Sequence, residues 1–335
     1  MFFPTHQSEK MKKAFITGAT GFLGINLIER LQLDNWEITA FHLPEEDLRI
    51  LSRFEVKCIP GNILFYPSLL AAIQKDHEVV FHLAGDTSMW PKNAKRQYQV
   101  NVQGTANVCK AAIEKGVQRL IVTSSSSAFG YHGSRLSEQT VSNALTCGMS
   151  YNQTKFLAEQ EIRKAVDLGL FAVMLNPCNI IGPYDPGGWS QLIKNACHHQ
   201  LPGFPPGIGT FAHVRDIADA HISAVKNGRR GENYLLGGVE ASFKDVINEI
   251  IRITGTDLSL KEISGFKLRA ATFLSSLQSF FTGREPTLTY PKYKRLVGKL
   301  TCDDSKAVRE LGFRTTSISE MLMDCYRWLQ QEKLL

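Results

Sequence analysis

Two patterns of apolar and polar residues alternate through the first half of the chain: short apolar runs, and apolar positions at helical spacing. Short and nearly continuous apolar runs predict strands that are covered on both faces, as in a parallel sheet. We expect these strands at residues 14–17, 37–41, 56–59, 79–83, 120–123 and 172–175. Between them, apolar positions recur at helical spacing and predict helices at residues 22–33, 67–74, 96–115 and 151–167. The alternation predicts a doubly wound α/β fold, whose ligands bind beyond the carboxyl ends of the strands.

The pattern changes after residue 180. Segments rich in glycine and proline at residues 182–188 and 202–207 predict loops. A helix and a strand that return to the first sheet are expected at residues 211–225 and 233–236. Four further helices are expected at residues 243–254, 266–281, 303–311 and 317–331.

A glycine-rich stretch joins the first expected strand to the first expected helix. Gly18, Gly21 and Gly24 give the spacing G-x-x-G-x-x-G. Gly18 lets the chain turn off the strand, Gly21 lets backbone approach a pyrophosphate, and Gly24 lets the helix pack on the strand. The free N–H groups at the helix start face the phosphates. A strand–loop–helix of this kind predicts a dinucleotide site rather than an ordinary turn.

These patterns predict two units. A Rossmann-type, dinucleotide-binding domain takes residues 11–179 and about 211–238. A smaller and discontinuous C-terminal lobe for the substrate takes residues of about 180–210 and 239–335. Residues 1–10 are expected to form an N-terminal extension.

A second candidate site opens the helix expected at residues 151–167. Tyr151 and Lys155 lie one helical turn apart and therefore share a face. A phenol is a poor proton donor near neutral pH, and a neighbouring cation improves it by stabilising the phenolate. Four serines at residues 124–127 follow the expected strand at residues 120–123, and a serine there would hydrogen-bond a substrate carbonyl that the phenol protonates. The alternatives are an exposed Tyr–Lys pair and a serine-rich polar turn.

Composition narrows the function classes. The net charge of the 335 residues is +6 without a block of like charges, so no nucleic-acid partner is expected. Seven scattered cysteines without a C-x-x-C pair favour reduced thiols and a cytoplasmic location. Cys197, His198 and His199 lack a second ligand cluster, so no metal site is expected. Residues 1–10 lack the apolar core of a signal peptide, and no apolar run predicts a membrane-spanning helix.

Several motifs, in order, resemble the extended short-chain dehydrogenases/reductases, which include the NAD-dependent epimerases and dehydratases. Residues 17–24 resemble T-G-A-x-G-F-L-G, and Tyr151 with Lys155 resembles Y-x-x-x-K. Residues 81–85, 101–105 and 211–216 resemble F-H-x-A-A, N-V-x-G-T and F-V-H-V-x-D. The likeness runs from about residue 12 to residue 311. Within the family, the dihydroflavonol-reductase-like and hopanoid-associated epimerase-like groups are most similar, on residues 83–90, 155–160, 176–177 and 282–286.

The resemblance implies a role for each matched position. Ser125 orients the carbonyl, Tyr151 exchanges the proton, and Lys155 holds the nicotinamide ribose. The implied cofactor-binding residues are Gly18, Thr20, Gly21, Phe22, Leu23, Gly24, His42, Asn62, Ile63, Leu83, Ala84, Gly85, Asn101, Thr123, Tyr151, Lys155, Pro177 and Asn179. Expected contacts to substrate are Asp86, Trp90, Ser127, Trp189 and Phe204, with Met89 and Phe211 as further candidate pocket walls. The alternative for the aromatic residues is packing between the lobes.

Two departures from the family pattern bear on cofactor and activity. After the second strand, NAD enzymes place an acid and NADP enzymes an arginine. His42 and Leu43 occupy that position, and Arg49 or Arg53 lies within reach of a 2′-phosphate, so the sequence slightly favours NADP over NAD. Asn176 replaces the arginine of many sugar-nucleotide epimerases, which counts against that activity.

We therefore expect an NAD(P)H-dependent reductase of a ketone or aldehyde in a small, apolar substrate. One alternative is a sugar-nucleotide epimerase or dehydratase with tightly bound NAD, and another is a sensor or scaffold that binds NADP(H) without turnover. A homodimer through residues 96–115 and 151–167 is typical of the family. The apolar stripe of residues 266–281 is interpreted as a lid packed on the lobe, with docking to a membrane as the alternative because Lys267 and Arg269 flank it.

Overall fold

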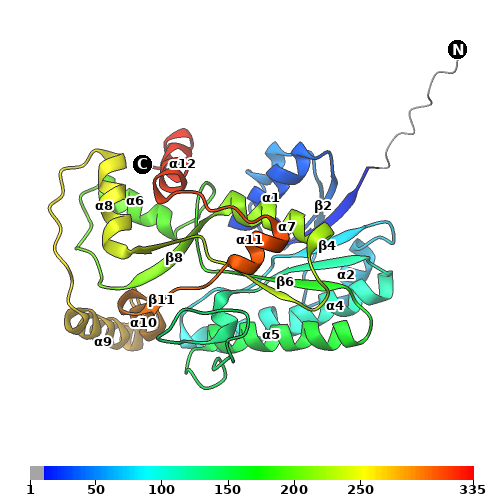
Figure 1. Ribbon diagram of the computed structural model, residues 1–335, viewed down its shortest axis with the longest axis horizontal. Helices are drawn as coiled ribbons and strands as arrows, with labels where there is room; N and C mark the ends of the chain where they lie inside the picture. The colour runs from blue at the N-terminus through cyan, green and yellow to red at the C-terminus, as the bar shows by residue number, and fades with distance from the viewer. Residues whose placement is uncertain (1–10) are drawn as a thin grey trace, which may run out of the picture.

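A seven-stranded parallel sheet forms the larger part of the computed structural model, which describes residues 11–335 (Figure 1). The strand order is β3–β2–β1–β4–β5–β6–β9, with every neighbouring pair parallel. The strands are β1 (Lys13–Thr17), β2 (Glu37–His42), β3 (Lys57–Pro60), β4 (Val79–His82), β5 (Arg119–Thr123), β6 (Ala172–Pro177) and β9 (Asn233–Leu236). This order confirms the doubly wound fold, whereas the expected extension at residues 1–10 lies outside the described residues.

Helices cover both faces of this sheet (Figure 1). One face carries α1 (Phe22–Leu33), α7 (Val214–Asn227) and α11 (Ser305–Leu311), and the other carries α2 (Tyr66–Ala72), α4 (Gly104–Lys115) and α5 (Ser150–Asp167). Strand side chains alternate between the two cores: Ile16 of β1 packs on the α1 side, and Phe15 on the α4 side. Apolar runs without polar alternation therefore identify strands that are buried on both faces.

The helix expected at residues 96–115 is divided. Helix α3 (Ala94–Tyr98) passes through a π-helical turn at Gln99–Gln103 before α4 begins. The wider turn contains Asn101, whose side chain bonds both the N–H and the carbonyl of Asp86, at 2.7 and 2.9 Å. π-turns of this kind often accompany functional positions, and this one fixes the chain that follows β4.

A smaller sheet forms the core of the second lobe, and the sequence pattern did not reveal it. It consists of β7 (Asn179–Ile181), β8 (Ile208–His213), β10 (Val239–Ser242) and β11 (Lys299–Leu300), with β8 bonded to the other three. Helices α6 (Trp189–Cys197), α8 (Phe243–Thr254) and α12 (Ile318–Gln331) surround it. The helix expected from residue 211 begins instead at Val214, because residues 211–213 complete β8.

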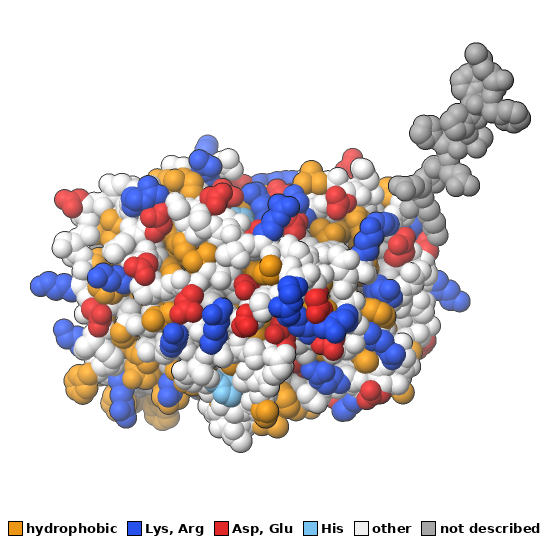
Figure 2. Space-filling view, in the orientation of Figure 1, with side chains coloured by type: hydrophobic (Ala, Val, Ile, Leu, Met, Phe, Trp, Pro, Cys, Tyr) orange, Lys and Arg blue, Asp and Glu red, His pale blue; other side chains and the backbone are white. Residues whose placement is uncertain are grey.

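Helix α9 (Gly265–Thr282) corrects one interpretation of the sequence. Its apolar stripe was interpreted as packed on the lobe, yet the exposed fractions of Phe266, Phe273 and Phe281 are 82%, 69% and 77%. The buried residues are Leu268, Thr272 and Ser279 on the opposite side. Figure 2 shows hydrophobic side chains gathered at the lower left edge, over the position of α9 in Figure 1. The neighbouring helix α10 (Tyr290–Val297) packs beside α9.

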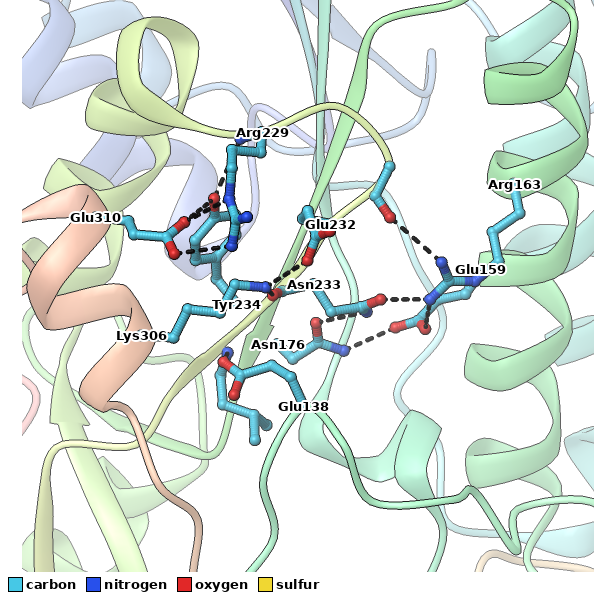
Figure 3. A network of polar contacts seen from close by, with 12 residues as sticks. Glu138, Glu159, Arg163, Asn176, Arg229, Glu232, Asn233, Tyr234, Lys306 and Glu310 are labelled. Carbon is cyan, nitrogen blue, oxygen red and sulfur yellow. Dashed lines mark hydrogen bonds and ion pairs between the residues drawn. The ribbon is translucent and has the colours of Figure 1, made fainter.

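A polar network holds helix α11 against the larger sheet (Figure 3). On α11, Glu310 accepts hydrogen bonds from Arg229 and Tyr234, while Lys306 donates to the carbonyl of Asn233 at 2.7 Å. The Asn233 side chain of β9 donates to Asn176 of β6 at 3.0 Å. The chain thus crosses from the smaller lobe back to the sheet at α11 and leaves again for α12. The division into domains drawn from the sequence stays a prediction.

Candidate active site

The glycine-rich loop brings α1 close to the ends of β1 and β4. Gly18 has a positive φ of 70°, and a Cβ on it would collide with the backbone of Ala84 at 2.6 Å. A Cβ on Gly24 would overlap the Gly18 carbonyl oxygen, so both positions need glycine. Within residues 11–335, no side chain caps the start of α1. Its first N–H groups are therefore available to an anion.

Two adjoining cavities run along this loop. The first, of about 270 Å³, lies against the ends of β2 and β3. The second, of about 580 Å³, extends to the ends of β5 and β6. Both are lined by Gly18, Gly21, Leu83 and Gly85, so they meet at the loop. Two hollows joined over a helix N-terminus fit the two halves of a dinucleotide with its pyrophosphate between them.

Most of the implied cofactor residues line these cavities. The smaller contains Thr20, His42, Asn62, Ile63 and Ala84. The larger contains Phe22, Leu23, Gly24, Thr123, Tyr151, Lys155, Pro177 and Asn179. Asn101 lies on neither wall, because its amide is bonded to Asp86 and to the Thr154 hydroxyl. The side-chain oxygen of Asn62 accepts the N–H of Leu64 at 2.8 Å, so it is already engaged where the resemblance implies a cofactor contact.

Ser125, Tyr151 and Lys155 line the same larger cavity. Ser125 follows β5 and accepts the N–H of Ser127 at 3.1 Å, which fixes its hydroxyl oxygen. Tyr151 stands in the first turn of α5, and the Lys155 ammonium one turn later donates to the carbonyl of Thr123 at 3.1 Å. Each of the three is at most 8% exposed. The arrangement places a hydroxyl, a phenol and an ammonium around one space at the carboxyl end of the sheet.

A buried carboxylate supports the end of β5. Glu159 on α5 accepts hydrogen bonds from the Ser124 hydroxyl and, at 2.7 Å, from the Asn176 amide. The same amide donates to the carbonyl of Ser125 at 3.0 Å. Asn176 is fully buried and faces this network rather than the cavity. Asn176 and Glu159 therefore position the backbone that carries Ser125.

Behind Lys155, a buried histidine joins β4 to its neighbours. His82 bonds the Thr17 hydroxyl at 2.7 Å and the Thr105 hydroxyl at 3.0 Å. Burial, followed by the charge of Lys155, lowers the pKa of His82 to about 3. The imidazole is consequently neutral at physiological pH, and it holds the strand ends together without adding charge to the site.

Arg295 is a charged residue of this cavity that the sequence motifs did not reveal. It comes from α10, yet its guanidinium lines the larger cavity and donates to the Ser127 hydroxyl at 2.7 Å. The guanidinium carbon lies 5.9 Å from the centre of the Tyr151 ring. No ion pair to Arg295 is formed by any acid among the described residues 11–335. Burial lowers the pKa of Arg295, as expected for a cation without a partnering anion.

A pair of thiols lies beside this cavity, and one of them, Cys178, is part of its wall. Cys178 follows β6, Cys302 follows β11, and their sulfur atoms lie 2.9 Å apart. The hydrogen bond from Cys302 lowers the pKa of the Cys178 thiol, whereas the pKa of Cys302 is raised well above its ordinary value. The contact ties the end of the larger sheet to the segment that leaves the smaller one.

The residues proposed as substrate contacts divide into two groups. Ser127 and Trp189 line cavities, and Met89 joins Trp189 on the larger one. Asp86 is paired with Arg96 at 2.7 Å and lines neither large cavity, and neither does Trp90. Phe204 and Phe211 are buried in the lobe core, which matches the alternative that they serve packing.

Comparison with known proteins gives one family. The profile of the NAD dependent epimerase/dehydratase family matches residues 14–237. The chain is 28% identical over 324 residues to a candidate dihydroflavonol 4-reductase of Synechocystis sp., with 94% of each chain covered. It is 28% identical over 326 residues to sterol demethylase protein B of Methylococcus capsulatus, covering 96% of this chain and 99% of the relative. It is 28% identical over 344 residues to 3beta-hydroxysteroid-dehydrogenase/decarboxylase isoform 1 of Arabidopsis thaliana, covering 91% and 76%.

Solved structures share the fold of this chain. The crystal structure of gox2253 is similar with a TM-score of 0.82 and 26% identity, covering 96% of this chain and 98% of that one. UDP-glucuronic acid 4-epimerase from Bacillus cereus, in complex with NAD, is similar with a TM-score of 0.76 and 20% identity, covering 95% and 96%. At that identity the second likeness concerns the fold alone. No helix within residues 11–335 is both long and apolar enough to span a bilayer.

Proposed function

The chain belongs to the NAD-dependent epimerase/dehydratase family, and we propose that it is an oxidoreductase interconverting a ketone or aldehyde and its alcohol on a small, apolar substrate. The observation that carries this proposal is the common cavity of Ser125, Tyr151 and Lys155, which adjoins the glycine-rich loop. Leu83, Met89 and Trp189 add apolar walls to that cavity. The family's cofactor is NAD or NADP.

Each side chain has a separate task in this proposal. A nicotinamide dinucleotide held along Gly18, Gly21 and Lys155 would supply or accept the hydride. The Ser125 hydroxyl orients the substrate oxygen, and the Tyr151 phenol gives that oxygen its proton in reduction or removes it in oxidation. The Lys155 ammonium, anchored on the Thr123 carbonyl, stabilises the phenolate left after proton transfer. The apolar walls exclude water from the reacting carbon.

Steady-state oxidation of NADH and NADPH with a panel of hydrophobic ketones and aldehydes tests the proposal. The expected result is consumption of one nicotinamide per carbonyl reduced, at a rate that depends on the apolar size of the carbonyl compound. Purified protein that carries tightly bound NAD and consumes none of it would instead favour the epimerase. Cofactor binding without turnover of any carbonyl compound would favour a sensor or scaffold.

Among the two cofactors we propose NAD(H), which changes the slight preference for NADP drawn from the sequence. That preference rested on Arg49 and Arg53, but Arg49 is paired with Asp47 at 2.6 Å and Arg53 with Glu332 at 2.5 Å. Neither arginine lines the cavity. Glu46 does, with its carboxylate held by the Thr20 hydroxyl at 2.8 Å and the Leu43 N–H at 3.0 Å. A fixed carboxylate there repels a 2′-phosphate.

Glu46→Gln is expected to move the ratio of kcat/KM values for NADPH and NADH about tenfold toward NADPH. Glutamine keeps the acceptor oxygen for Thr20 and Leu43 and removes the negative charge. The neighbouring, exposed Glu45 provides the matched control, because Glu45→Gln removes a charge that does not line the cavity. An unchanged ratio in Glu46→Gln would place the discrimination elsewhere.

Arg295 supports a narrower substrate class, namely apolar alcohols or ketones that carry an anionic group near the reacting carbon. A guanidinium without an ion-pair partner, held beside the phenol, is suited to a bidentate carboxylate. The decarboxylase in the name of the Arabidopsis relative agrees with a carboxyl-bearing substrate. Loss of carbon dioxide is easy for a β-keto acid, so oxidation of a β-hydroxy acid would be followed by decarboxylation.

Arg295→Met is expected to raise KM for a carboxylate-bearing apolar substrate about a hundredfold. Its turnover of a neutral ketone of the same shape should stay within about threefold, because methionine preserves most of the apolar stem. Arg314→Met removes an exposed arginine and serves as the control. Equal losses on both substrates would show instead that Arg295 acts by holding Ser127 and the Tyr151 ring.

The same guanidinium keeps a sugar-nucleotide epimerase as the second candidate, since a diphosphate is also an anion. A nucleotide diphosphate needs a basic group beside the cavity, and Arg295 supplies one. The two candidates differ in what happens to the cofactor: an epimerase regenerates its own NAD and shows no net change in nicotinamide absorbance. The expected dimer through residues 96–115 and 151–167 stays a prediction.

A further inference from the structure

Helix α9 exposes its apolar face to solvent, whereas an ordinary surface helix exposes its polar face. Six large apolar side chains lie within about a third of its circumference at 3.6 residues per turn. They form the apolar face of α9: Phe266, Phe273, Leu274, Leu277, Phe280 and Phe281, with exposed fractions of 82%, 69%, 63%, 45%, 77% and 77%. A contiguous apolar patch of this kind marks an interaction surface.

The polar side of α9 is fixed against the protein, so the helix is held in this rotation. The Ser279 hydroxyl donates to the carbonyl of Arg284 at 2.6 Å, and the Ser275 hydroxyl accepts the N–H of Leu288 at 3.2 Å. Thr272 is buried on the same side. Turning the helix to bury its phenylalanines would break these contacts. The exposed face therefore belongs to the fold.

The segment of the chain that carries this face is rich in basic residues. Residues 261–299 contain eight Lys and Arg residues but only two acids, Glu262 and Glu285, which gives a net +6, the same as the whole chain. Lys267 and Arg269 lie on α9 itself, one at each border of the apolar face when the helix is viewed along its axis. Figure 2 shows Lys and Arg side chains among the hydrophobic ones at this edge.

From this combination we propose that the apolar face of α9 docks the protein on an anionic lipid bilayer. Phenylalanine and leucine enter the boundary between headgroups and acyl chains, while the flanking cations pair with lipid phosphates. A second copy of this chain suits the face less well, because a two-fold contact would bring two segments of +6 together. The helix lies on the surface, since no helix of residues 11–335 is long and apolar enough to span the membrane.

This inference goes beyond the proposed function and does not depend on it. The two meet at α10, which packs on α9 and carries Arg295 into the larger cavity. Docking would thus bring one wall of that cavity next to the membrane surface. An apolar substrate with an anionic group has its place in that same layer.

Flotation of the full chain with lipid vesicles tests the docking. Vesicles of phosphatidylcholine with about one third phosphatidylglycerol should carry the protein, and vesicles of phosphatidylcholine alone should bind it at least about tenfold more weakly. Phe280→Ser with Phe281→Ser is expected to reduce binding to the anionic vesicles at least about tenfold. Val141→Ser with Leu168→Ser is the matched control, because those side chains are 86% and 77% exposed elsewhere and should leave binding unchanged.

Three results would overturn the proposal. They are an absence of vesicle binding by the unmodified chain, equal binding by the α9 variant, and light scattering that shows a dimer which the α9 variant converts to a monomer. The last would assign the face to a second copy. Thermal unfolding checks that the variants remain folded. Cofactor titration in solution reports separately on the catalytic site, so failure of docking is distinguishable from failure of the enzyme proposal.

Discussion

Tyr151→Phe lowers kcat by about a thousandfold while the affinity for the nicotinamide cofactor stays within about threefold. Among our predictions this is the largest effect on a rate, and it comes from removing one hydroxyl group. Phenylalanine fills the same space in the first turn of α5, so the cavity wall shared with Lys155 and Arg295 is preserved. Only the proton-transferring group is lost, and hydride transfer to an unprotonated carbonyl is slow. Fluorescence titration of NADH and single-turnover kinetics measure the two quantities separately.

The comparison needs a tyrosine whose hydroxyl has no such task. Tyr98 on α3 is 44% exposed, and Tyr98→Phe should leave kcat unchanged. Undiminished turnover in Tyr151→Phe would remove the mechanism proposed for Ser125, Tyr151 and Lys155. A loss of cofactor affinity as large as the loss of kcat would mean that the phenol serves binding rather than proton transfer.

Asn176→Leu is expected to lower the free energy of unfolding by about 4 kcal/mol, the largest stability effect among these predictions. Leucine has a similar volume but cannot donate to Glu159 or to the Ser125 carbonyl, and it cannot accept from Asn233. A carboxylate would be left buried with one donor fewer. Urea denaturation at neutral pH gives the free energy, and kcat should fall as well because Ser125 loses its support.

Asn227→Leu controls for the change of side chain. Asn227 is exposed at the end of α7, so its replacement should stay within about 0.5 kcal/mol. A similarly small effect for Asn176→Leu would show that the Glu159 carboxylate finds another partner in the folded chain. The network in Figure 3 would then be less tightly coupled than its hydrogen bonds indicate.

Most of the larger sheet was predictable because its inner strands are buried on both faces, which leaves an unbroken apolar run in the sequence. Helices α1 and α8 were predicted at the bounds that the structure gives, Phe22–Leu33 and Phe243–Thr254. In α8 a capping box of Ser242 and Asp245 marks the start. The strands of the smaller sheet are as short as two residues in β11 and interrupted by loops, so no periodicity develops in them.

Part of the candidate site was likewise predictable from the sequence, and part was not. Ser125, Tyr151 and Lys155 stand at positions that local motifs identify, and the structure brings them to one cavity. Arg295 reaches that cavity from far along the chain, and only tertiary folding brings α10 there. Glu46 was overlooked because it follows β2 at an unusual distance and turns back to Thr20. A hydrophobic periodicity identified α9 as amphipathic, but periodicity alone does not say which face meets the protein.

Strand β8 runs into α7 without a connecting loop, so one element of the smaller lobe continues as a helix that covers the larger sheet. The chain also returns to the larger sheet at α11, so it passes between the two parts of the molecule more than once. Neither part can be exchanged as a separate segment of the chain. A cut between the two parts would remove α7 or β9 from the larger sheet. Changes in substrate preference during evolution must therefore come from replacing side chains and surface segments in place, and the two parts are expected to melt together.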